Sequence, residues 1–290
     1  MLSLTIVIPT KDRPGFLHSA TLAALADLPQ NSCVIVVDDH GTKPAKDALA
    51  DITDPRLKVL PNSGPRGPSS ARNFGVAQAK TELIVFADDD DLLAPGYVSH
   101  VVQMAQTARY GFCATETFTT PPSQIPAFHP QQNLPLDTLP FRKQLGGLGC
   151  GFWIYRRDFH SVGGINPALR VNEDTDFSIR LLAANLTGSF QTGTGVLIRQ
   201  HLAAGADGNL GQITKRANAA ARAGYFATII ADNAAYLARR PAAKRYLTKR
   251  QVKMLAKAGQ FRAGINACRS APSLLGYFAL NYLVSRVRAA

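Results

Sequence analysis

The sequence predicts an α/β protein built on a doubly wound parallel β-sheet, and three features of residues 1–110 point to it. Short apolar runs rich in Val, Ile and Leu recur along this region, as in strands that are buried on both faces. Stretches with the apolar spacing of an amphipathic helix separate the runs. Polar residues follow each run directly. Strands that alternate with helices in this way pair in parallel, with the helices as crossovers.

The individual elements follow from local signals. We expect, in chain order, a strand at 4–8, a helix at 15–28, a strand at 34–37, a helix near 45–50, a strand at 57–60, a helix at 70–79, a strand at 83–87 and a helix at 97–104. Pro29 ends the first helix, and Ser69 or Ser70 is a candidate N-cap of the third. Residues 114–148, rich in Pro, Gln and Thr, are expected to form a long irregular loop that closes over a site. Trp153 is expected in the core, with stacking on a ring of a bound ligand as the alternative.

Charge divides the chain into two regions. Residues 1–208 hold 17 Lys and Arg against 19 Asp and Glu, whereas residues 209–290 hold 15 Lys and Arg and a single acid, Asp232. We therefore predict an α/β domain at 1–208, with halves at 1–110 and 111–208, and a helical basic region at 209–290. A segment so poor in acids suggests an anionic partner.

Composition excludes several classes of protein. A chain of 290 residues with 46% apolar content can bury a large core, so disorder is not expected. The four cysteines are far apart and form no CxxC pair, which argues against a disulfide framework and a zinc ribbon and fits a reducing compartment. The N-terminal residues lack the pattern of an export signal, so the expected location is the cytoplasm.

Polar clusters follow the expected strands at Thr10–Arg13, Asp38–Asp39, Asn62–Gly67 and Asp88–Asp91. The carboxyl ends of parallel strands meet at one edge of a sheet, so the four clusters should share one crevice. Four consecutive carboxylates would repel one another strongly without a cation. We expect Asp88 and Asp90 to point the same way and hold a metal, and Asp91 to cap the next helix. An acidic solvated turn is the alternative.

The Gly-rich segment 62–75 lacks both the Gly-Lys-Ser/Thr ending of a P-loop and a GxGxxG fingerprint. It offers instead two arginines, Arg66 and Arg72, which can pair with a diphosphate or stack on a base.

The ordered set of motifs resembles family 2 glycosyltransferases, which have the GT-A fold. The matching pieces are Val7-Ile8-Pro9-Thr10 with Arg13, Val36-Val37-Asp38-Asp39, Asn62-x-Gly64 with Ala71-Arg72-Asn73-x-Gly75, Phe86 to Asp91 with Pro95, Gly149-Cys150-Gly151, Arg156-Arg157, Val162-Gly163-Gly164 and Asn172 to Leu181. Their order and spacing fit over roughly residues 3 to 202, and the basic tail lies outside the resemblance. It implies a nucleotide-binding half at 1–110 and an acceptor-binding half at 111–208.

The resemblance also implies roles for individual residues. The positions that would contact a nucleotide-sugar donor are Pro9, Thr10, Arg13, Asp38, Asp39, Arg66, Arg72, Asp88, Asp89 and Glu173. Asp88 and Asp90 match the family's DxD signature, which holds Mg²⁺ or Mn²⁺ on the diphosphate. His201 matches a histidine that some relatives bring to the metal or the phosphates, with a structural histidine as the alternative. Departures from the family pattern at Asp12 and His40 leave the choice among UDP, GDP and dTDP open.

Glu173-Asp174 resembles the family's second acidic motif, which implies that Asp174 is the catalytic base. Such a base must lie within about 3 Å of the acceptor hydroxyl, while a metal stabilises the departing diphosphate. Attack opposite the leaving group would invert the anomeric centre. Capping of the following helix is the alternative role of these acids, and both roles can coexist.

The basic tail shows helical periodicity at Ile213–Leu237 and Tyr246–Ile265. The apolar run Leu274–Val284 is too short for the ~20 residues of a membrane span. It can lie at the cytoplasmic face of a membrane, with Tyr277, Tyr282, Arg286 and Arg288 at the level of the headgroups. Packing on the α/β domain, or a homo-oligomer formed through the tail helices, is the alternative.

The resemblance therefore implies an inverting, metal-dependent transfer of a sugar to an acceptor hydroxyl, in bacterial surface polysaccharide or lipopolysaccharide synthesis. The expected partners are a nucleotide-diphosphate sugar, a saccharide or lipid-linked acceptor and an anionic membrane surface; nucleic acid is not expected. Two other functions stay open: a sugar-phosphate nucleotidyltransferase, and a non-catalytic scaffold that binds nucleotide sugar and a membrane.

Overall fold

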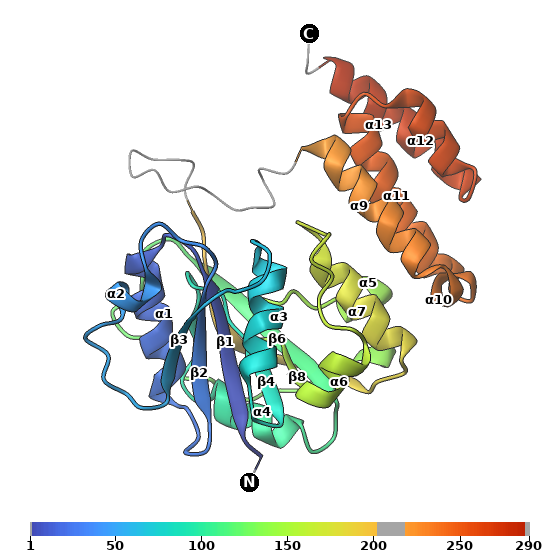
Figure 1. The fold of residues 1–290 in the computed structure, drawn as a ribbon. Helices are drawn as coiled ribbons and strands as arrows, with labels where there is room; N and C mark the ends of the chain where they lie inside the picture. Colours follow the sequence, from blue (N-terminus) through green and yellow to red (C-terminus); the bar gives the residue numbers. More distant parts are fainter. Residues whose placement is uncertain (1, 202–217, 288–290) are drawn as a thin grey trace. The chain divides into compact units, whose positions relative to one another are not determined.

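The computed structural model describes residues 2–201 and 218–287 (Figure 1). Contacts within the chain divide it into two compact units, Met1–Leu202 and Ala203–Ala290, called here the first and second units. The predicted domain boundary at residue 208, the predicted helix start at Ile213 and the predicted lipid contact Arg288 lie outside the described residues.

The first half of the first unit is the alternating strand–helix pattern that the sequence predicts. Its elements are β1 (Leu4–Thr10), α1 (Pro14–Ala26), β2 (Cys33–Asp38), α2 (Ala45–Ala48), β3 (Leu57–Pro61), α3 (Pro68–Gln78) and β4 (Leu83–Phe86). The four strands lie in the order β3-β2-β1-β4 and all pair in parallel. The chain reverses its winding direction between β1 and β4, and ligands of such sheets bind in the crevice at this point.

β1 is buried along its whole length because helices cover both faces of the sheet (Figure 1). Ile6 and Ile8 belong to the core cluster that contains α1 residues, whereas Val7 belongs to the cluster that contains α3 residues. Gly75 allows α3 to approach β1 closely, since a Cβ at this position would lie 2.5 Å from Val7 Cγ1. This close packing fixes the start of α3 beside the carboxyl end of β1.

The second half of the first unit extends the sheet with mixed pairing. Its elements are β5 (Leu92–Leu93), α4 (Tyr97–Met104), β6 (Tyr110–Phe118), β7 (Asn133–Pro135), η1 (Leu136–Thr138), α5 (Phe141–Gln144), β8 (Trp153–Tyr155), α6 (Arg156–Ser161), α7 (Glu173–Ala183) and β9 (Gly188–Arg199). The sheet continues from β4 as β8-β6-β9-β5, and β7 also pairs with β9. β8 is antiparallel to both its neighbours, and β5 and β7 are antiparallel to β9. The predicted parallel pairing therefore holds from β1 to β4, and of the later pairs only β6 with β9 is parallel.

Three local predictions need correction. Residues 114–148 are not irregular throughout, because β6 continues to Phe118 and β7, η1 and α5 follow. Neither Ser69 nor Ser70 caps α3, which begins at Pro68 after Gly67. Asp91 does not cap α4, because β5 intervenes and the helix begins after Gly96.

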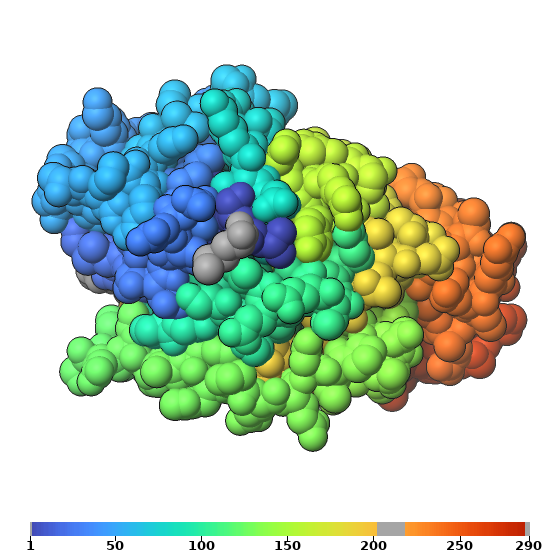
Figure 2. Space-filling model, turned by 90° about the horizontal axis from the view of Figure 1, so that it is seen from below, coloured from blue at the N-terminus to red at the C-terminus, as the bar shows by residue number. Residues whose placement is uncertain are grey.

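Two further features of the first unit concern side chains and surface. Trp153 is fully buried in β8, which confirms its predicted place in the core. On the face seen in Figure 2, the green chain that follows β6 forms the lower edge of the first unit.

The second unit is helical, as the sequence predicts. It contains α9 (Ala219–Asp232), α10 (Ala234–Ala238), α11 (Pro241–Lys257), α12 (Phe261–Cys268), η2 (Pro272–Leu274) and α13 (Leu275–Val287). α11 packs against α9, α12 and α13. Among the described residues, no helix combines the length and the apolar character needed to cross a bilayer.

Candidate active site

The acidic run after β4 forms a tight cluster at the carboxyl edge of the sheet. Oxygen atoms of Asp88, Asp90 and Asp91 all lie within 4.8 Å of one another. Burial raises the pKa of Asp91 well above its ordinary range, and the charges of Asp88 and Asp90 raise it further. Carboxylate oxygens are the ligands that Mg²⁺ and Mn²⁺ prefer. Three converging carboxylates therefore fit a divalent cation, whose charge would relieve their mutual repulsion. The sequence predicted Asp88 and Asp90 as metal ligands but did not predict that Asp91 would join them.

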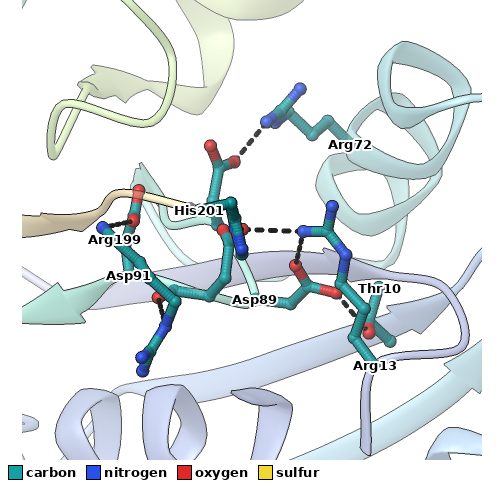
Figure 3. A network of polar contacts seen from close by, with 9 residues as sticks. Thr10, Arg13, Arg72, Asp89, Asp91, Arg199 and His201 are labelled. Atoms are coloured by element: carbon teal, nitrogen blue, oxygen red, sulfur yellow. Dashed lines mark hydrogen bonds and ion pairs between the residues drawn. The ribbon is translucent and has the colours of Figure 1, made fainter. Parts of the chain in front are cut away.

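The end of β9 holds this acidic turn in place (Figure 3). The backbone N–H of Arg199 donates to Asp91 Oδ1 at 2.8 Å, and its Nε donates to the carbonyl of Asp90 at 3.2 Å. The guanidinium of Arg199 lies between two rings, 4.5 Å from the centroid of Phe16 and 4.6 Å from that of Phe118. Sequence reasoning missed Arg199, because its contacts depend on the register of β9 against β5.

His201 and Arg13, both labelled in Figure 3, contact the same oxygen of Asp90. His201 Nε2 lies 2.7 Å from Asp90 Oδ2, and Arg13 Nη1 donates to the same oxygen at 2.8 Å. The imidazole also packs edge-on against Phe16, with the ring centroids 5.6 Å apart. The predicted metal histidine thus lies beside the acid cluster, with its Nε2 directed at a cluster carboxylate.

Asp89 points away from the cluster and joins β4 to β1. Its carboxylate accepts hydrogen bonds from Thr10 Oγ1 at 2.7 Å and from Arg13 Nη1 at 3.1 Å. Burial raises the pKa of Asp89 to about 6, although Arg13 and Thr10 favour its ionised form. Pro9 is buried in β1 immediately before Thr10. These contacts align the ends of the two strands at the point where the winding direction reverses.

Arg72 connects the acid cluster to the second acidic motif. This α3 side chain is buried, and its Nη2 donates to Asp88 Oδ1 at 2.5 Å. Its Nη1 lies 3.9 Å from Glu173 Oε1. Burial raises the pKa of Glu173 to about 7, against the opposing effect of Arg72. The Nε of Arg72 is buried and has no hydrogen-bond partner among the described residues, so the site contains an unused donor.

Asp174 lies in the first turn of α7, next to Glu173. Asn172, with a φ of 65°, turns the chain into the helix, and Asp174 Oδ1 accepts from the backbone N–H of Thr175 at 2.6 Å. Burial raises the pKa of Cys150 to about 12, and the negative charges of Asp88 and Asp174 contribute to the increase. Asp88 and Asp174 therefore act on the same thiol.

A second Gly-rich segment, residues 146–151, passes close to both acidic motifs. A Cβ at Gly149 would lie 2.4 Å from Asp88 Oδ2, and a Cβ at Gly147 would lie 3.9 Å from Asp174 Oδ2. Larger side chains at Gly149 would displace the Asp88 carboxylate. Sequence reasoning quoted this segment among the motifs but assigned no site role to it.

The remaining predicted donor contacts lie at the end of β2 and on the loops that follow β2 and β3. Asp39 is buried and accepts from the backbone N–H of Gly67 at 2.9 Å and from Asn62 Nδ2 at 2.9 Å. Asp38 accepts from the backbone N–H groups of Gly41 and Ala45, each at 2.9 Å. Both aspartates thus use oxygen atoms to shape the loops that follow β2 and β3.

Two further loop residues, Arg66 and Asp12, differ in how they are bound. Arg66 is exposed, and no hydrogen bond or ion pair is found for it within the described part of the chain. Asp12, where the family pattern differs, accepts from the backbone N–H groups of Thr42 at 2.6 Å and Lys43 at 2.9 Å. The loop after β1 is therefore tied to the loop after β2.

Comparisons with known proteins add a family and a fold. A sequence model described as "Glycosyl transferase family 2" matches residues 5–163. The succinoglycan biosynthesis protein ExoW of Rhizobium meliloti (strain 1021) is 33% identical over 36% of this chain and 34% of its own length. The succinoglycan biosynthesis protein ExoU of the same organism is 28% identical over 61% of this chain and 56% of its own length. The matches thus span about a third to just over half of these relatives.

A relative with a named lipid-linked substrate also matches. The GalNAc(5)-diNAcBac-PP-undecaprenol beta-1,3-glucosyltransferase of Campylobacter jejuni is 30% identical over 40% of this chain and 40% of its own length. Among solved structures, S. aureus TarS 1–349 in complex with UDP aligns with a TM-score of 0.67 at 14% identity, over 98% of this chain and 89% of that chain. The structure of GalNAc-T7 with UDP, GalNAc and Mn²⁺ aligns with a TM-score of 0.55 at 16% identity, over 70% of this chain and 45% of that chain. At these identities the likeness establishes the fold alone.

Proposed function

The chain belongs to glycosyl transferase family 2, and on that premise we propose that it transfers a sugar from a nucleoside-diphosphate donor to an acceptor hydroxyl with inversion at the anomeric carbon. The GT-A fold implied by the sequence resemblance is confirmed. The observation that carries the proposal is Arg72, which donates to Asp88 and lies 3.9 Å from Glu173. A single buried guanidinium thus spans the two acidic motifs that the reaction requires.

Asp88, Asp90 and Asp91 are the residues that would hold the divalent cation, Mg²⁺ or Mn²⁺. When bound, the cation would stabilise the negative charge that develops on the departing diphosphate. The clustering of three carboxylate oxygens within 4.8 Å supports this assignment. His201 would act beside it, as a ligand or as a hydrogen-bond partner that orients Asp90.

The donor would lie across the carboxyl edge of the sheet. Arg72 has an unused buried Nε and therefore suits a diphosphate oxygen. The nucleoside would occupy the crevice bounded by Pro9 and Thr10 and by the loops that Asp38 and Asp39 hold. Arg66, exposed at the rim, is available to stack on the base or to pair with a phosphate.

Asp174 would act as the general base. It would accept the proton of the acceptor hydroxyl while the oxygen forms a bond to the anomeric carbon and the bond from that carbon to the diphosphate oxygen breaks. Its place in the first turn of α7, directly after Glu173 and so beside the motif that Arg72 contacts, supports this role. Glu173, paired with Arg72, would hold the start of the helix in position.

We propose a saccharide acceptor, carried on a lipid, within surface polysaccharide synthesis. The name of the Campylobacter jejuni relative describes transfer of glucose to a chain linked to undecaprenyl diphosphate, and two Rhizobium meliloti relatives are named for succinoglycan biosynthesis. Family membership favours glycosyl transfer over sugar-phosphate nucleotidyl transfer and over a scaffold without activity.

A thermal-shift panel tests the donor class and the cation together. UDP, GDP and dTDP are each added with Mn²⁺, with Mg²⁺ and with EDTA, and the expected result is a rise in melting temperature for one nucleotide only when a cation is present. The matching sugar nucleotides are then incubated with the protein, and release of the nucleoside diphosphate is measured. Equal shifts with and without the cation would contradict a metal-bridged donor. Release of pyrophosphate from a sugar phosphate and a nucleoside triphosphate would instead assign nucleotidyl transfer.

A further inference from the structure

α11 carries a row of basic side chains along one face. Arg245, Lys249, Lys253 and Lys257 are all exposed and recur at every fourth position. Residues at this spacing are neighbours on a helix surface, and like charges there destabilise the helix. The opposite face of α11 is buried and includes Leu247, Val252 and Leu255. The four residues are called here the basic ridge.

α13 carries exposed apolar side chains along its outer face. Leu280 is 62% exposed, Leu283 63%, Val284 43% and Val287 78%. Their spacing of three and four residues places them on one side of the helix. The inner side of α13 is anchored by Phe278, which is fully buried and packs where a Cβ at Gly264 of α12 would lie 2.0 Å from its ring. The four residues are called here the apolar stripe.

The ridge and the stripe lie next to each other. Arg245 Nε donates to Ser273 Oγ at 3.1 Å, and Lys249 Nζ lies 4.7 Å from the centroid of the Tyr277 ring. Further along, Ser285 Oγ donates to the carbonyl of Ala256 at 2.9 Å. These contacts hold α13 alongside α11 in the same direction. Leu280, Val284 and Val287 follow Tyr277 at intervals of three, seven and ten residues, so the stripe begins beside the ridge.

The net positive charge of the second unit indicates which kind of partner binds the ridge and the stripe. Residues 218–287 contain twelve Lys and Arg and one acid, Asp232. A second copy of the chain would bring two basic ridges together and would be repelled. Nucleic acid would match the charge of the ridge but would not bury the exposed Leu and Val side chains of the stripe. A bilayer with anionic headgroups satisfies both features, since the aliphatic side chains enter the interface and the basic side chains remain at the headgroups.

We propose that the second unit docks on an anionic phospholipid surface through the basic ridge of α11 and the apolar stripe of α13. The two tyrosines predicted to lie at the headgroups are not equivalent in this arrangement. Tyr282 packs against Phe261 with ring centroids 5.1 Å apart and accepts a hydrogen bond from Arg286 Nη2 at 3.0 Å, so it stabilises the unit itself. The inference rests on residues 218–287 alone, and its failure would leave the proposed reaction untouched.

Vesicle flotation of the full chain tests the proposal. Vesicles of phosphatidylcholine alone are compared with vesicles that also contain phosphatidylglycerol, at low and at high salt. The expected result is binding only with the anionic lipid, and loss of binding at high salt. The Lys249→Gln/Lys253→Gln variant removes two charges of the ridge and should weaken partitioning about 30-fold. The Leu280→Ser/Leu283→Ser variant should weaken it about tenfold or more.

Matched controls separate these effects from general charge and fold. Lys46→Gln/Lys58→Gln removes two exposed charges from the first unit, and Leu22→Ser replaces a leucine that is 46% exposed on α1; both should float as the unchanged protein does. Unchanged flotation of the ridge and stripe variants would overturn the proposal. Light scattering without lipid provides the second arm: a dimer that dissociates in the stripe variant would assign the surface to a second copy of the chain and would also overturn it.

Discussion

Arg199 and Asp91 lie 108 residues apart in the chain, yet the backbone N–H of Arg199 donates to the Asp91 carboxylate at 2.8 Å. This bond forms because β9 pairs with β5 directly after the acidic turn, with Leu197 opposite Leu92. The same residue reaches back through its side chain to the carbonyl of Asp90. The geometry of the acid cluster thus depends on the end of β9, and Arg199 is a positioning residue for it.

Replacement of Arg199 by Lys tests this dependence. The charge and the backbone bond to Asp91 are retained, but the planar group between Phe16 and Phe118 and the Nε bond to Asp90 are lost. We expect affinity for Mn²⁺ to fall about 10-fold to 100-fold, as for other residues that orient metal ligands. We expect a loss of unfolding free energy of about 1 kcal/mol. Titration calorimetry and urea denaturation measure the two effects.

Arg157→Lys is the matched control for that variant. Arg157 lies over the Tyr155 ring at 5.4 Å but is far more exposed and has no contact with the acidic turn. Its replacement should leave Mn²⁺ affinity unchanged. Equal loss of affinity in both variants would remove the positioning role from Arg199.

Replacement of Asp174 by Asn tests the general base. The amide has nearly the same shape but cannot accept the proton, so kcat should fall about 10² to 10⁴-fold while the dissociation constant of the donor stays the same. Single-turnover assays and donor titrations separate the two quantities. Asp137→Asn, an exposed acid in η1, is the control and should retain full activity. An unimpaired Asp174→Asn enzyme would assign the base to another residue.

Sequence patterns predicted the parallel half of the sheet because its signals are local. The apolar run of β1, the turn residues after it and the acids after β4 all lie within short segments, and their convergence at Thr10 and Asp89 follows from parallel pairing. The antiparallel pairing of β8 and the two-residue strand β5 have no such local pattern. Asp91 therefore looked like a cap for α4, and its true partner, Arg199, was visible only through β9.

In the second unit, too, the sequence predicted the local features but not those that depend on packing. Helical periodicity identified the tail as helical, and the single acid identified it as basic. Which apolar residues remain exposed depended on packing between helices. Phe278 and Leu283 both belong to the apolar part of the tail, but only Phe278 is buried, because Gly264 of α12 makes room for it.

Replacement of Arg72 by Met tests the link between the two acidic motifs. The buried cation pairs with Asp88 and lies near Glu173, so its loss leaves two carboxylates without compensation. For a fully buried pair such a loss costs about 3–5 kcal/mol; the Asp88 side chain is 34% exposed, so we expect about 2–3 kcal/mol by urea denaturation. Donor affinity should also fall. The exposed Arg142 replaced by Met serves as control and should change neither quantity.

The pH dependence of metal binding follows from the buried acids. Burial raises the pKa of Asp89 to about 6 and that of Asp91 further above its usual range. A raised carboxyl pKa means that the metal-free folded protein keeps protons which the unfolded chain releases near pH 4. These two groups therefore stabilise the metal-free folded protein fully below about pH 4. This stabilisation is lost as the pH rises from there through the folded pKa values.

A divalent cation bound by Asp88, Asp90 and Asp91 must displace the proton of Asp91. We expect Mn²⁺ affinity to increase from pH 6 to pH 8, with release of protons that calorimetry detects as a dependence of the binding heat on the ionisation enthalpy of the buffer. Asp91→Asn removes the group with the higher pKa and should make the affinity less dependent on pH in this range. A pH-independent affinity in the unchanged protein would contradict this account of the cluster.

Replacement of Gly149 by Ala tests how closely the segment 146–151 packs against Asp88. The added Cβ would lie 2.4 Å from Asp88 Oδ2, a distance that Cβ atoms essentially never show, so the carboxylate must shift from its place in the cluster. We expect Mn²⁺ affinity to fall about tenfold, since displaced ligands bind a cation poorly. Gly15→Ala in α1 is the control: nothing lies within 4 Å of its added Cβ, and it should leave Mn²⁺ affinity unchanged. Unchanged metal affinity in Gly149→Ala would show that Asp88 can adjust without loss, and would weaken its assignment as a ligand.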